Sequence, residues 1–206
     1  MRKCLGVLLL LSSLLIIGGC APKPQKDCGF VQNSYGERVS WKSDGPIKMY
    51  LHESVPEAFV PAIQAAAETW AKNSGHPLFQ IITSPRVTGP IQPHQDGKNI
   101  IYYMDTWEET RSSEQARTSI YWSGDLIQEA DMRINDKDFD FYWTGNGMEK
   151  SVSAVNIEAL VLHELGHVLG LKHKDTDGSV MATYLASGAD RTQLADTDVA
   201  DLKCEY

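Results

Sequence analysis

This 206-residue chain contains the stretch His163-Glu164-Leu165-Gly166-His167-Val168-Leu169-Gly170-Leu171-Lys172-His173. His163 and His167 are four residues apart, so in a helix their side chains share one face, with Cβ atoms about 5–6 Å apart. Gly170 can adopt backbone angles closed to other residues, so the helix can end there and the chain can turn back. That turn would bring the His173 side chain close to those of His163 and His167. Three protein ligands that leave one tetrahedral corner open for water are typical of a catalytic zinc site.

The alternative is that these histidines are solvated surface residues. The neighbouring side chains argue against it, because they are apolar almost all round the helix, and such a helix is usually buried. These neighbours are Ala159, Leu160, Val161, Leu162, Leu165, Val168 and Leu169. Buried polar side chains need partners, and one metal ion would supply partners for all three imidazoles.

Glu164 is adjacent to His163 and is expected near the open corner of the metal. It cannot easily be a fourth ligand while both helical histidines bind, so we predict that it is a general base that takes the proton of the water. The alternative role for Glu164 is a salt-bridged structural residue.

The motif resembles that of the metzincin clan of zinc endopeptidases. Ser179-Val180-Met181, whose methionine lies eight residues after His173, resembles the Met-turn that forms an apolar floor under the zinc. An ordinary core methionine is the alternative for Met181. Within the clan the chain is most similar to the matrixins, over residues 41–206. The resemblance implies an α+β, zincin-like fold: a twisted, mostly parallel five-stranded sheet with an antiparallel edge strand, two long helices and a C-terminal helix.

Hydrophobic periodicity places these elements along the chain. We expect strands at residues 47–51, 79–82, 100–104, 117–122 and 126–134, and helices at 59–70, from Ser153 or Asn156 onward, and at 194–202. Ser54 and Glu57 have the spacing of a capping box, and residues 83–99 are expected to form a loop. By resemblance, 117–122 is the edge strand above the cleft, which can accept an extended peptide as an additional strand. An edge strand that binds no ligand is the alternative.

The resemblance also assigns roles near the Met-turn. Asp198 is expected to support that turn, and Tyr184 either lines the substrate pocket or donates to the oxyanion. Thr183 stands where the family has proline, and the Gly- and Asp-rich loop that holds structural zinc and calcium in the animal enzymes is missing. We therefore expect one catalytic zinc ion and no further structural zinc.

Six acidic or histidine residues outside the motif could in principle bind a metal ion, but ordinary surface roles are more frequent for such residues. Alternating aspartates could bind calcium, but a solvated turn is the more frequent role of such a run. The remaining histidines are expected at the surface. The aspartates are Asp136, Asp138 and Asp140, and the histidines are His52, His76 and His94.

The N-terminus has the features of a targeting segment. Arg2 and Lys3 precede an apolar stretch from Leu5 to Ile17, which is short for a membrane span and fits a signal peptide at residues 1–19. The sequence Ile17-Gly18-Gly19-Cys20 resembles a bacterial lipobox, so we expect cleavage before Cys20, lipidation of its thiol and a tether over residues 20–40. An ordinary secretory signal is the alternative. The implied location is the bacterial membrane, the outer membrane in a Gram-negative cell, facing the periplasm or the exterior.

The charge of the chain restricts its partners. Removing Arg2 and Lys3 from the 19 basic residues leaves 17 against 27 acidic ones, a net charge of −10. That charge argues against nucleic acid and against adsorption on anionic lipid. Membrane attachment is therefore expected through the N-terminal lipid alone, and the domain is expected to be monomeric.

Two cysteines remain after signal removal and lipidation. Cys28 and Cys204 lie near the two ends of the domain, and an exported chain can keep a disulfide between them. The alternative is that Cys28-Gly29 blocks the zinc as a thiolate, in the manner of the matrixin cysteine switch, although the residues that flank that switch are absent.

The motif and the resemblance together predict a zinc metalloendopeptidase that cleaves peptide or protein substrates outside the cytoplasm. Two alternatives stay open: a zinc lipoprotein that binds peptide or cell-wall material without cleaving it, and a hydrolase of peptidoglycan cross-links. An intact Glu164 argues against the first of these, because a binding module needs no base.

Overall fold

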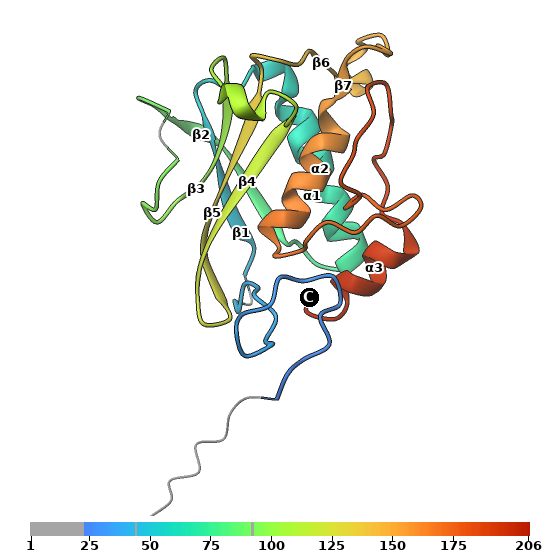
Figure 1. Ribbon diagram of the computed structural model, residues 1–206. Helices are drawn as coiled ribbons and strands as arrows, with labels where there is room; N and C mark the ends of the chain where they lie inside the picture. Colours follow the sequence, from blue (N-terminus) through green and yellow to red (C-terminus); the bar gives the residue numbers. More distant parts are fainter. Residues whose placement is uncertain (1–22, 44, 92) are drawn as a thin grey trace, which may run out of the picture.

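The computed structural model describes residues 23–43, 45–91 and 93–206. A five-stranded sheet lies at its centre, with the strands in the spatial order β2-β1-β3-β5-β4 (Figure 1). Neighbouring strands are parallel except for the edge strand β4, which runs antiparallel to β5. The strands are β1 (Ile47–His52), β2 (Phe79–Val87), β3 (Asn99–Met104), β4 (Ala116–Ser123) and β5 (Leu126–Asn135). The predicted α+β architecture is confirmed.

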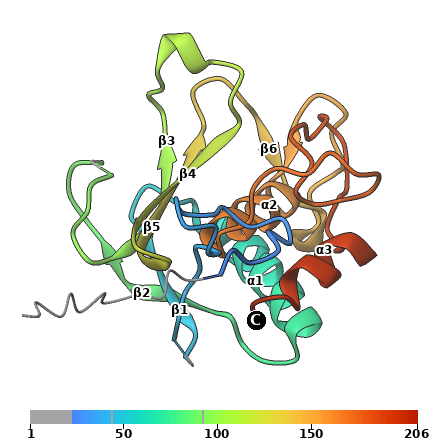
Figure 2. The same ribbon diagram turned by 60° about the horizontal axis from the view of Figure 1, so that its bottom comes forward.

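Two long helices cover one face of the sheet (Figures 1 and 2). They are α1 (Val60–Ser74) and α2 (Ile157–Val168), and a short pair of parallel strands, β6 (Phe141–Tyr142) and β7 (Val155–Asn156), precedes α2. The expected C-terminal helix is α3 (Asp196–Leu202). Single 3-10 turns complete the structure: η1 (Glu57–Phe59), η2 (Glu109–Arg111) and η3 (Thr144–Asn146).

The core lies between the helices and the sheet. Apolar side chains of the central strands, such as Ile101, Met132 and Ile134, pack beneath α1 and α2. The indole N–H of Trp70 on α1 donates to the main-chain oxygen of Leu162 at 2.9 Å, so the two helices are joined by a buried hydrogen bond as well as by packing. The opposite face of the sheet carries a smaller cluster of Ile100, Tyr102, Met104 and Trp107.

The packed domain begins earlier than the tether expected at residues 20–40. Phe30 and Val39 are fully buried, and Phe30 forms a β-bridge with Leu171. Cys28 is joined to Cys204 by a disulfide, which fixes this segment beside the C-terminal end of the chain (Figure 1). The signal peptide and Cys20 lie outside the described residues.

The start of the first helix differs from the expectation. Ser54 and Glu57 form no capping box, because α1 begins at Val60 and no side chain caps it or the turn η1 before it. The Ser54 hydroxyl instead accepts the N–H of Tyr103 at 3.0 Å. Pro61 lies in the first turn of α1, where its missing N–H costs no hydrogen bond.

His52 was expected at the surface, and this was wrong: the side chain is buried, with 3% of its area exposed. Its Nε2 lies 3.0 Å from the main-chain oxygen of Gly89, and its Nδ1 accepts the N–H of Ser54 at 3.0 Å. The loop predicted for residues 83–99 is also shorter than expected, because β2 continues to Val87. His76 and His94 are exposed.

No helix in the described part of the chain combines the length and apolar character that a bilayer span requires.

Two carboxylates are buried on β5, on the face of the sheet away from the helices. Glu129 accepts the N–H groups of Asp96 and Gly97, so both of its oxygens have partners. Asp131 Oδ1 accepts the N–H of Ile100 at 3.0 Å, whereas its Oδ2 has no hydrogen-bond partner among the described residues. Burial, with further contributions from Glu129 and Asp96, raises the pKa of Asp131 from 3.8 to about 7.

This shift predicts a pH-dependent stability. Because the folded state holds the Asp131 proton more tightly than the unfolded state, the stabilising contribution is complete below about pH 4 and is lost as the pH rises through about 7. The Asp131→Asn variant removes the buried charge, so at pH 8 its free energy of unfolding should exceed that of the wild type by at least about 1 kcal/mol. Urea unfolding at pH 5, 6, 7 and 8 measures this, and parallel curves for the two proteins would contradict it.

Gly166 marks the closest approach of α2 to the elements below it. A Cβ atom at this position would overlap the Sδ atom of Met181 and would lie 3.1 Å from Cζ2 of Trp70. Both of these side chains are buried. The absence of a side chain at Gly166 therefore lets the helix settle on them.

We predict that Gly166→Ala destabilises the domain by about 1–3 kcal/mol, although alanine favours helix, because overpacking a buried contact forces its neighbours to move. Thermal unfolding measures the effect. The double variant Gly166→Ala with Met181→Ala serves as the control, since the shorter side chain makes room for the added methyl group and the two changes should cost less than their sum. A single Gly166→Ala variant as stable as the wild type would show that the contact is not tight.

Candidate metal centre

The helix that carries the motif begins at a defined cap. Asn156, one of the two expected N-caps, accepts the N–H groups of Glu158 at 3.0 Å and Ala159 at 3.3 Å. Its own side-chain N–H donates to Asp190. The cap fixes the first turn of α2 and hence the direction in which the later histidines point.

The helix ends where the motif predicts. Gly170 has φ 100°, a left-handed conformation that favours glycine, and its N–H donates to the main-chain oxygen of His167 at 2.9 Å. A side chain at Gly170 would also overlap the main-chain oxygen of Val39, so the N-terminal segment crosses directly over this turn. The chain then reverses and brings His173 back to the helix.

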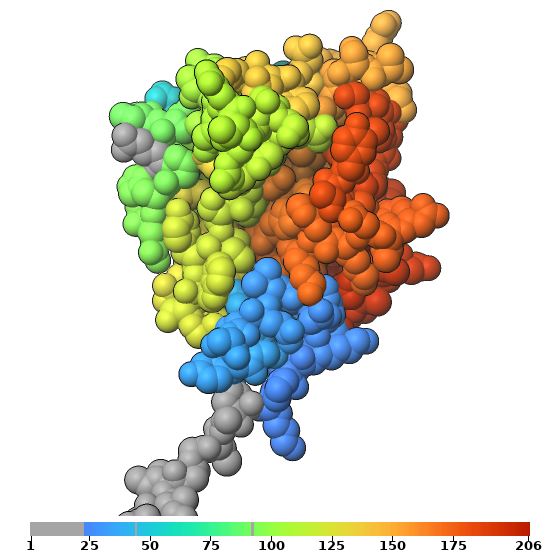
Figure 3. Space-filling model, in the orientation of Figure 1, coloured from blue at the N-terminus to red at the C-terminus, as the bar shows by residue number. Residues whose placement is uncertain are grey.

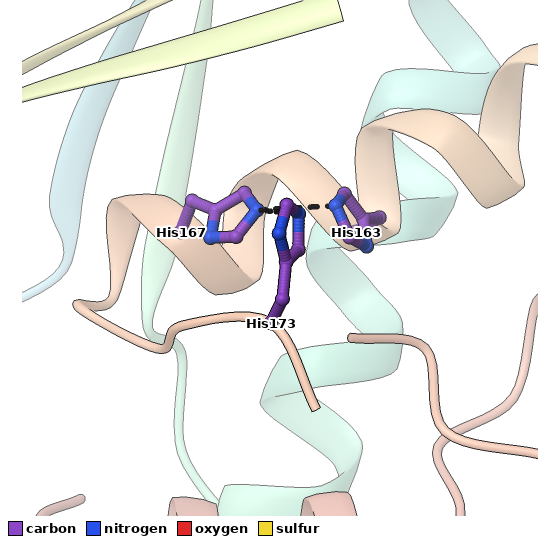
Figure 4. A group of neighbouring side chains, drawn as sticks. All are labelled: His163, His167 and His173. Atoms are coloured by element: carbon purple, nitrogen blue, oxygen red, sulfur yellow. Dashed lines mark hydrogen bonds between the residues drawn. The ribbon is translucent and has the colours of Figure 1, made fainter. Parts of the chain in front are cut away.

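The three imidazoles converge (Figure 4). His167 Nε2 lies 3.1 Å from His163 Nε2 and 3.1 Å from His173 Nε2. Two nitrogens bound to one tetrahedral zinc ion, with bonds of about 2.0–2.1 Å, lie about 3.3 Å apart. Within the described part of the chain, these three residues are the group of histidine, cysteine or acidic side chains with ligand atoms close enough to hold a metal ion.

The hydrogen bonds of the Nδ1 atoms determine the tautomer of the two helical imidazoles. His163 Nδ1 lies 2.7 Å from the main-chain oxygen of Val180, and His167 Nδ1 lies 2.7 Å from that of Leu171. A carbonyl oxygen only accepts, so each Nδ1 must carry the hydrogen, and each neutral ring then presents a bare lone pair at Nε2. Burial lowers the pKa of His163 to about 3, so this ring is neutral at physiological pH.

The converging lone pairs are the observation that fits a cation. The Nε2 lone pairs of His163 and His167 face one another across 3.1 Å without a hydrogen between them and repel, and a divalent ion bound by both nitrogens reverses that interaction. Neutral imidazole is a preferred zinc ligand. The donor set is therefore suited to zinc.

The chain that follows His173 returns to α2 at Met181. Met181 is buried against Gly166, in the position expected of a Met-turn. Asp198 on α3 accepts the hydroxyl of Ser179 at 2.5 Å and the N–H of Val180 at 2.9 Å. Asp198 therefore anchors the segment whose carbonyl group orients His163.

Glu164 projects from α2 beside the imidazoles and has 4% of its area exposed. Its Oε2 accepts the hydroxyl of Thr118, on the edge strand β4, at 2.6 Å. Burial raises the pKa of Glu164, and the electrostatic influence of the neighbouring His167 and the hydrogen bond from Thr118 act in the opposite direction. A buried carboxylate with a raised pKa in a cleft has the properties of a proton acceptor.

An open cleft of about 690 Å³ runs between β4 and the chain that follows Met181 (Figure 3). Glu164 and the three histidines form its floor, and Tyr184, 75% exposed, lies on its rim. The walls include Ala116, Arg117, Thr118, Ile120 and Trp122 from β4, and Ala182, Thr183, Tyr184 and Leu185 from the opposite side. Because β4 ends the sheet, its outer main-chain groups face this cleft.

Three contacts of the cleft could not be found from the motif. Thr118 bonds Glu164, the side chain of Gln115 donates to the main-chain oxygen of Leu185 at 2.9 Å, and Asp175 accepts the N–H of Thr183 at 2.7 Å. Each joins segments whose proximity only the fold reveals. Asp175 also accepts the Thr183 hydroxyl and so holds the rim where the family has proline.

The structure also bears on the expected roles of Cys28 and of three aspartates. Cys28 is in a disulfide, so the thiolate that the cysteine-switch alternative requires is absent. Asp136, Asp138 and Asp140 are exposed and do not form a group that could hold a metal ion within the described residues. Asp138 instead accepts an N–H of the Asn135 side chain at 3.0 Å.

Comparison with known proteins agrees with this geometry. The family model described as Matrixin matches residues 25–206, and thus begins before residue 41 and includes the packed N-terminal segment. Metalloendoproteinase 2-MMP of Arabidopsis thaliana is 32% identical over 73 residues, which are 34% of this chain and 19% of that relative, so the match covers about a fifth of the relative's length. The chain belongs to the matrixin family of metallopeptidases.

Proposed function

We propose that this protein is a zinc-dependent endopeptidase that hydrolyses peptide bonds of proteins outside the cytoplasm. The observation that carries the proposal is the convergence of three imidazole Nε2 atoms beside a buried carboxylate, on the floor of an open cleft. His163, His167 and His173 would hold the ion, and Glu164 lies next to it.

The ion and the chain divide the chemistry between them. A zinc ion at this site supplies Lewis acidity, which lowers the pKa of water to about 7 and polarises a carbonyl oxygen. The chain supplies the ligands, whose lone pairs are directed by the carbonyl groups of Val180 and Leu171. Met181 is buried against Gly166, on the helix that carries two of the ligands.

Glu164 moves the proton. Its carboxylate accepts the proton of the attacking water as the new carbon–oxygen bond forms. It then delivers that proton to the amide nitrogen as the carbon–nitrogen bond breaks, so that the products are an amine and a carboxylic acid, which then ionises. Burial raises the pKa of Glu164, which suits a group that must both accept and release a proton.

The edge strand β4 is the proposed binding site for the substrate main chain. An extended peptide can pair with its unpaired N–H and C=O groups as a sixth strand, which places a peptide bond above the floor residues. Ala182 to Leu185 form the facing wall, where Tyr184 is positioned to contact a substrate side chain. Because this recognition uses main-chain groups, it suits unfolded or extended protein segments.

We further propose that the protein is exported and anchored by lipid at Cys20. The basic and apolar residues 2–17 and the sequence Ile17-Gly18-Gly19-Cys20 support this. The disulfide between Cys28 and Cys204 supports an oxidising compartment, since such bonds are rare in reducing ones. Because the domain is negatively charged and is repelled by anionic lipid, the proposed membrane contact is the N-terminal lipid alone.

A mixed peptide library tests the activity. Purified protein should cleave internal peptide bonds, a metal chelator should abolish cleavage, and added zinc should restore it. Glu164→Gln keeps the three ligands and should lose at least about a hundredfold in turnover, because it removes the proton acceptor. Glu68→Gln, an exposed glutamate on α1, is the matched control. Products are identified by mass spectrometry.

The alternatives give different results in the same assay. Binding of peptides without cleavage would indicate a binding protein, and cleavage of peptidoglycan fragments but not of linear peptides would indicate a cross-link hydrolase. Wild-type turnover in Glu164→Gln would exclude Glu164 as the base.

The metal ligands make a separate prediction. His167→Ala should lose bound zinc, because it removes the nitrogen that lies within 3.1 Å of both others and leaves two ligands. Elemental analysis of protein purified in the presence of zinc should give about one ion per wild-type chain, the same for the exposed control His76→Ala, and far less for His167→Ala. Full zinc occupancy in His167→Ala would contradict this ligand role.

A further inference from the structure

The Thr118 hydroxyl is the side-chain partner of the Glu164 carboxylate. Its Oγ1 lies 2.6 Å from Glu164 Oε2 and 3.4 Å from the main-chain oxygen of Glu164. A hydroxyl has one hydrogen and an ionised carboxylate only accepts, so at these distances the hydrogen is donated to Oε2. We propose that Thr118 is a positioning residue that holds Glu164 in its catalytic orientation, an inference that rests on the proposed role of Glu164 as the base.

The carboxylate needs such a partner. A glutamate side chain has several rotatable bonds, and a base that drifts from the water by about 1 Å loses much of its effect. The bond from Thr118 engages Oε2 and leaves Oε1 outside it. One oxygen is therefore fixed to the sheet, and the other is not held by the Thr118 hydroxyl and stays available for the water proton.

The position of Thr118 suits this task. It pairs across the sheet with Met132, which is fully buried beneath the helices, so Thr118 shares the face of the sheet that meets α2. Threonine is β-branched and stiff about χ1, so the strand backbone also fixes the direction of its hydroxyl. Ser119, the next residue, pairs with Asp131 and lies on the opposite face.

Thr118 also links the base to the substrate. It lies on β4, the strand that we propose to pair with the peptide main chain, and it lines the cleft. The same rigid strand would thus place the scissile bond and the carboxylate relative to each other. A hydrogen bond to an ionised acceptor is stronger than one to a neutral acceptor, so the contact also favours the form of Glu164 that accepts a proton.

Four variants test the inference: Thr118→Val, which keeps the shape and removes the hydroxyl, Thr118→Ser, which keeps the hydroxyl, Thr88→Val as the matched control at an exposed threonine after β2, and Glu164→Gln. For Thr118→Val we expect kcat to fall roughly tenfold to a hundredfold, the loss typical of a hydrogen bond to a charged group, with KM within about twofold of the wild type. Zinc content should be unchanged. Thr118→Ser should recover most of kcat, and Thr88→Val should match the wild type.

A further comparison isolates the partnership. In the Glu164→Gln background, adding Thr118→Val should lower the residual turnover much less than it does in the wild-type background, because the carboxylate that it positions is gone. Equal losses in the two backgrounds would overturn the inference. So would wild-type kcat in Thr118→Val, failure of Thr118→Ser to recover activity, or loss of zinc from Thr118→Val, which would indicate a structural role.

The outcomes also separate this inference from the proposed function. If Glu164→Gln is inactive while Thr118→Val has wild-type kcat, Glu164 stays the base and only the positioning role of Thr118 fails. If Glu164→Gln retains wild-type turnover, the proposed function fails and the positioning role fails with it. A rise in KM with unchanged kcat in Thr118→Val would assign the hydroxyl to peptide binding instead.

Discussion

The candidate metal centre depends on two hydrogen bonds from imidazole Nδ1 atoms to main-chain carbonyl groups. A helix by itself places His163 and His167 on one face, but it leaves each ring free to rotate. The carbonyl groups of Leu171 and Val180 remove that freedom and leave both Nε2 lone pairs directed at one point. Both carbonyl groups belong to the chain that follows the helix, so the site exists only when that chain is folded back against α2. Asp198 on α3 fixes part of it by accepting the N–H of Val180.

Both ends of the domain meet at the end of α2. The last turn of any helix leaves carbonyl groups without intrahelical partners. Here the indole N–H of Trp41 donates to the main-chain oxygen of Val168, and the hydroxyl of Tyr206 donates to that of Leu169. The N–H of Val31 donates to the main-chain oxygen of Gly170. The segment after Cys28 and the C-terminal residues thus support the turn that delivers the third histidine, and the disulfide joins these two supports to each other.

The parts that the sequence predicted are those encoded by nearby residues. The helix cap at Asn156, the turn at Gly170 and the spacing of the histidines depend on contacts within a few positions, and the mostly parallel sheet with an antiparallel edge strand followed from the family resemblance. Predictions failed where the partner is distant. The residues near Ser54 in the sequence are compatible with a helix cap, but its hydroxyl accepts the main-chain N–H of Tyr103 instead. Thr118 gave no signal at all, because Glu164 is 46 residues away along the chain and adjacent only across the fold.

Burial alone does not distinguish the candidate base from the other buried carboxyl group. Glu164 and Asp131 both have a pKa that burial raises, and both accept a hydrogen bond from a neighbouring strand. Their surroundings differ. Asp131 lies on the face of the sheet away from the helices, beside the carboxylate of Glu129, so its charge is opposed by a like charge as well as by burial. Glu164 lies in the cleft beside imidazoles that favour its ionised form, and a stiff hydroxyl group fixes one of its oxygens. A raised pKa therefore marks a catalytic group only when the carboxylate also has a fixed orientation and a route to the substrate.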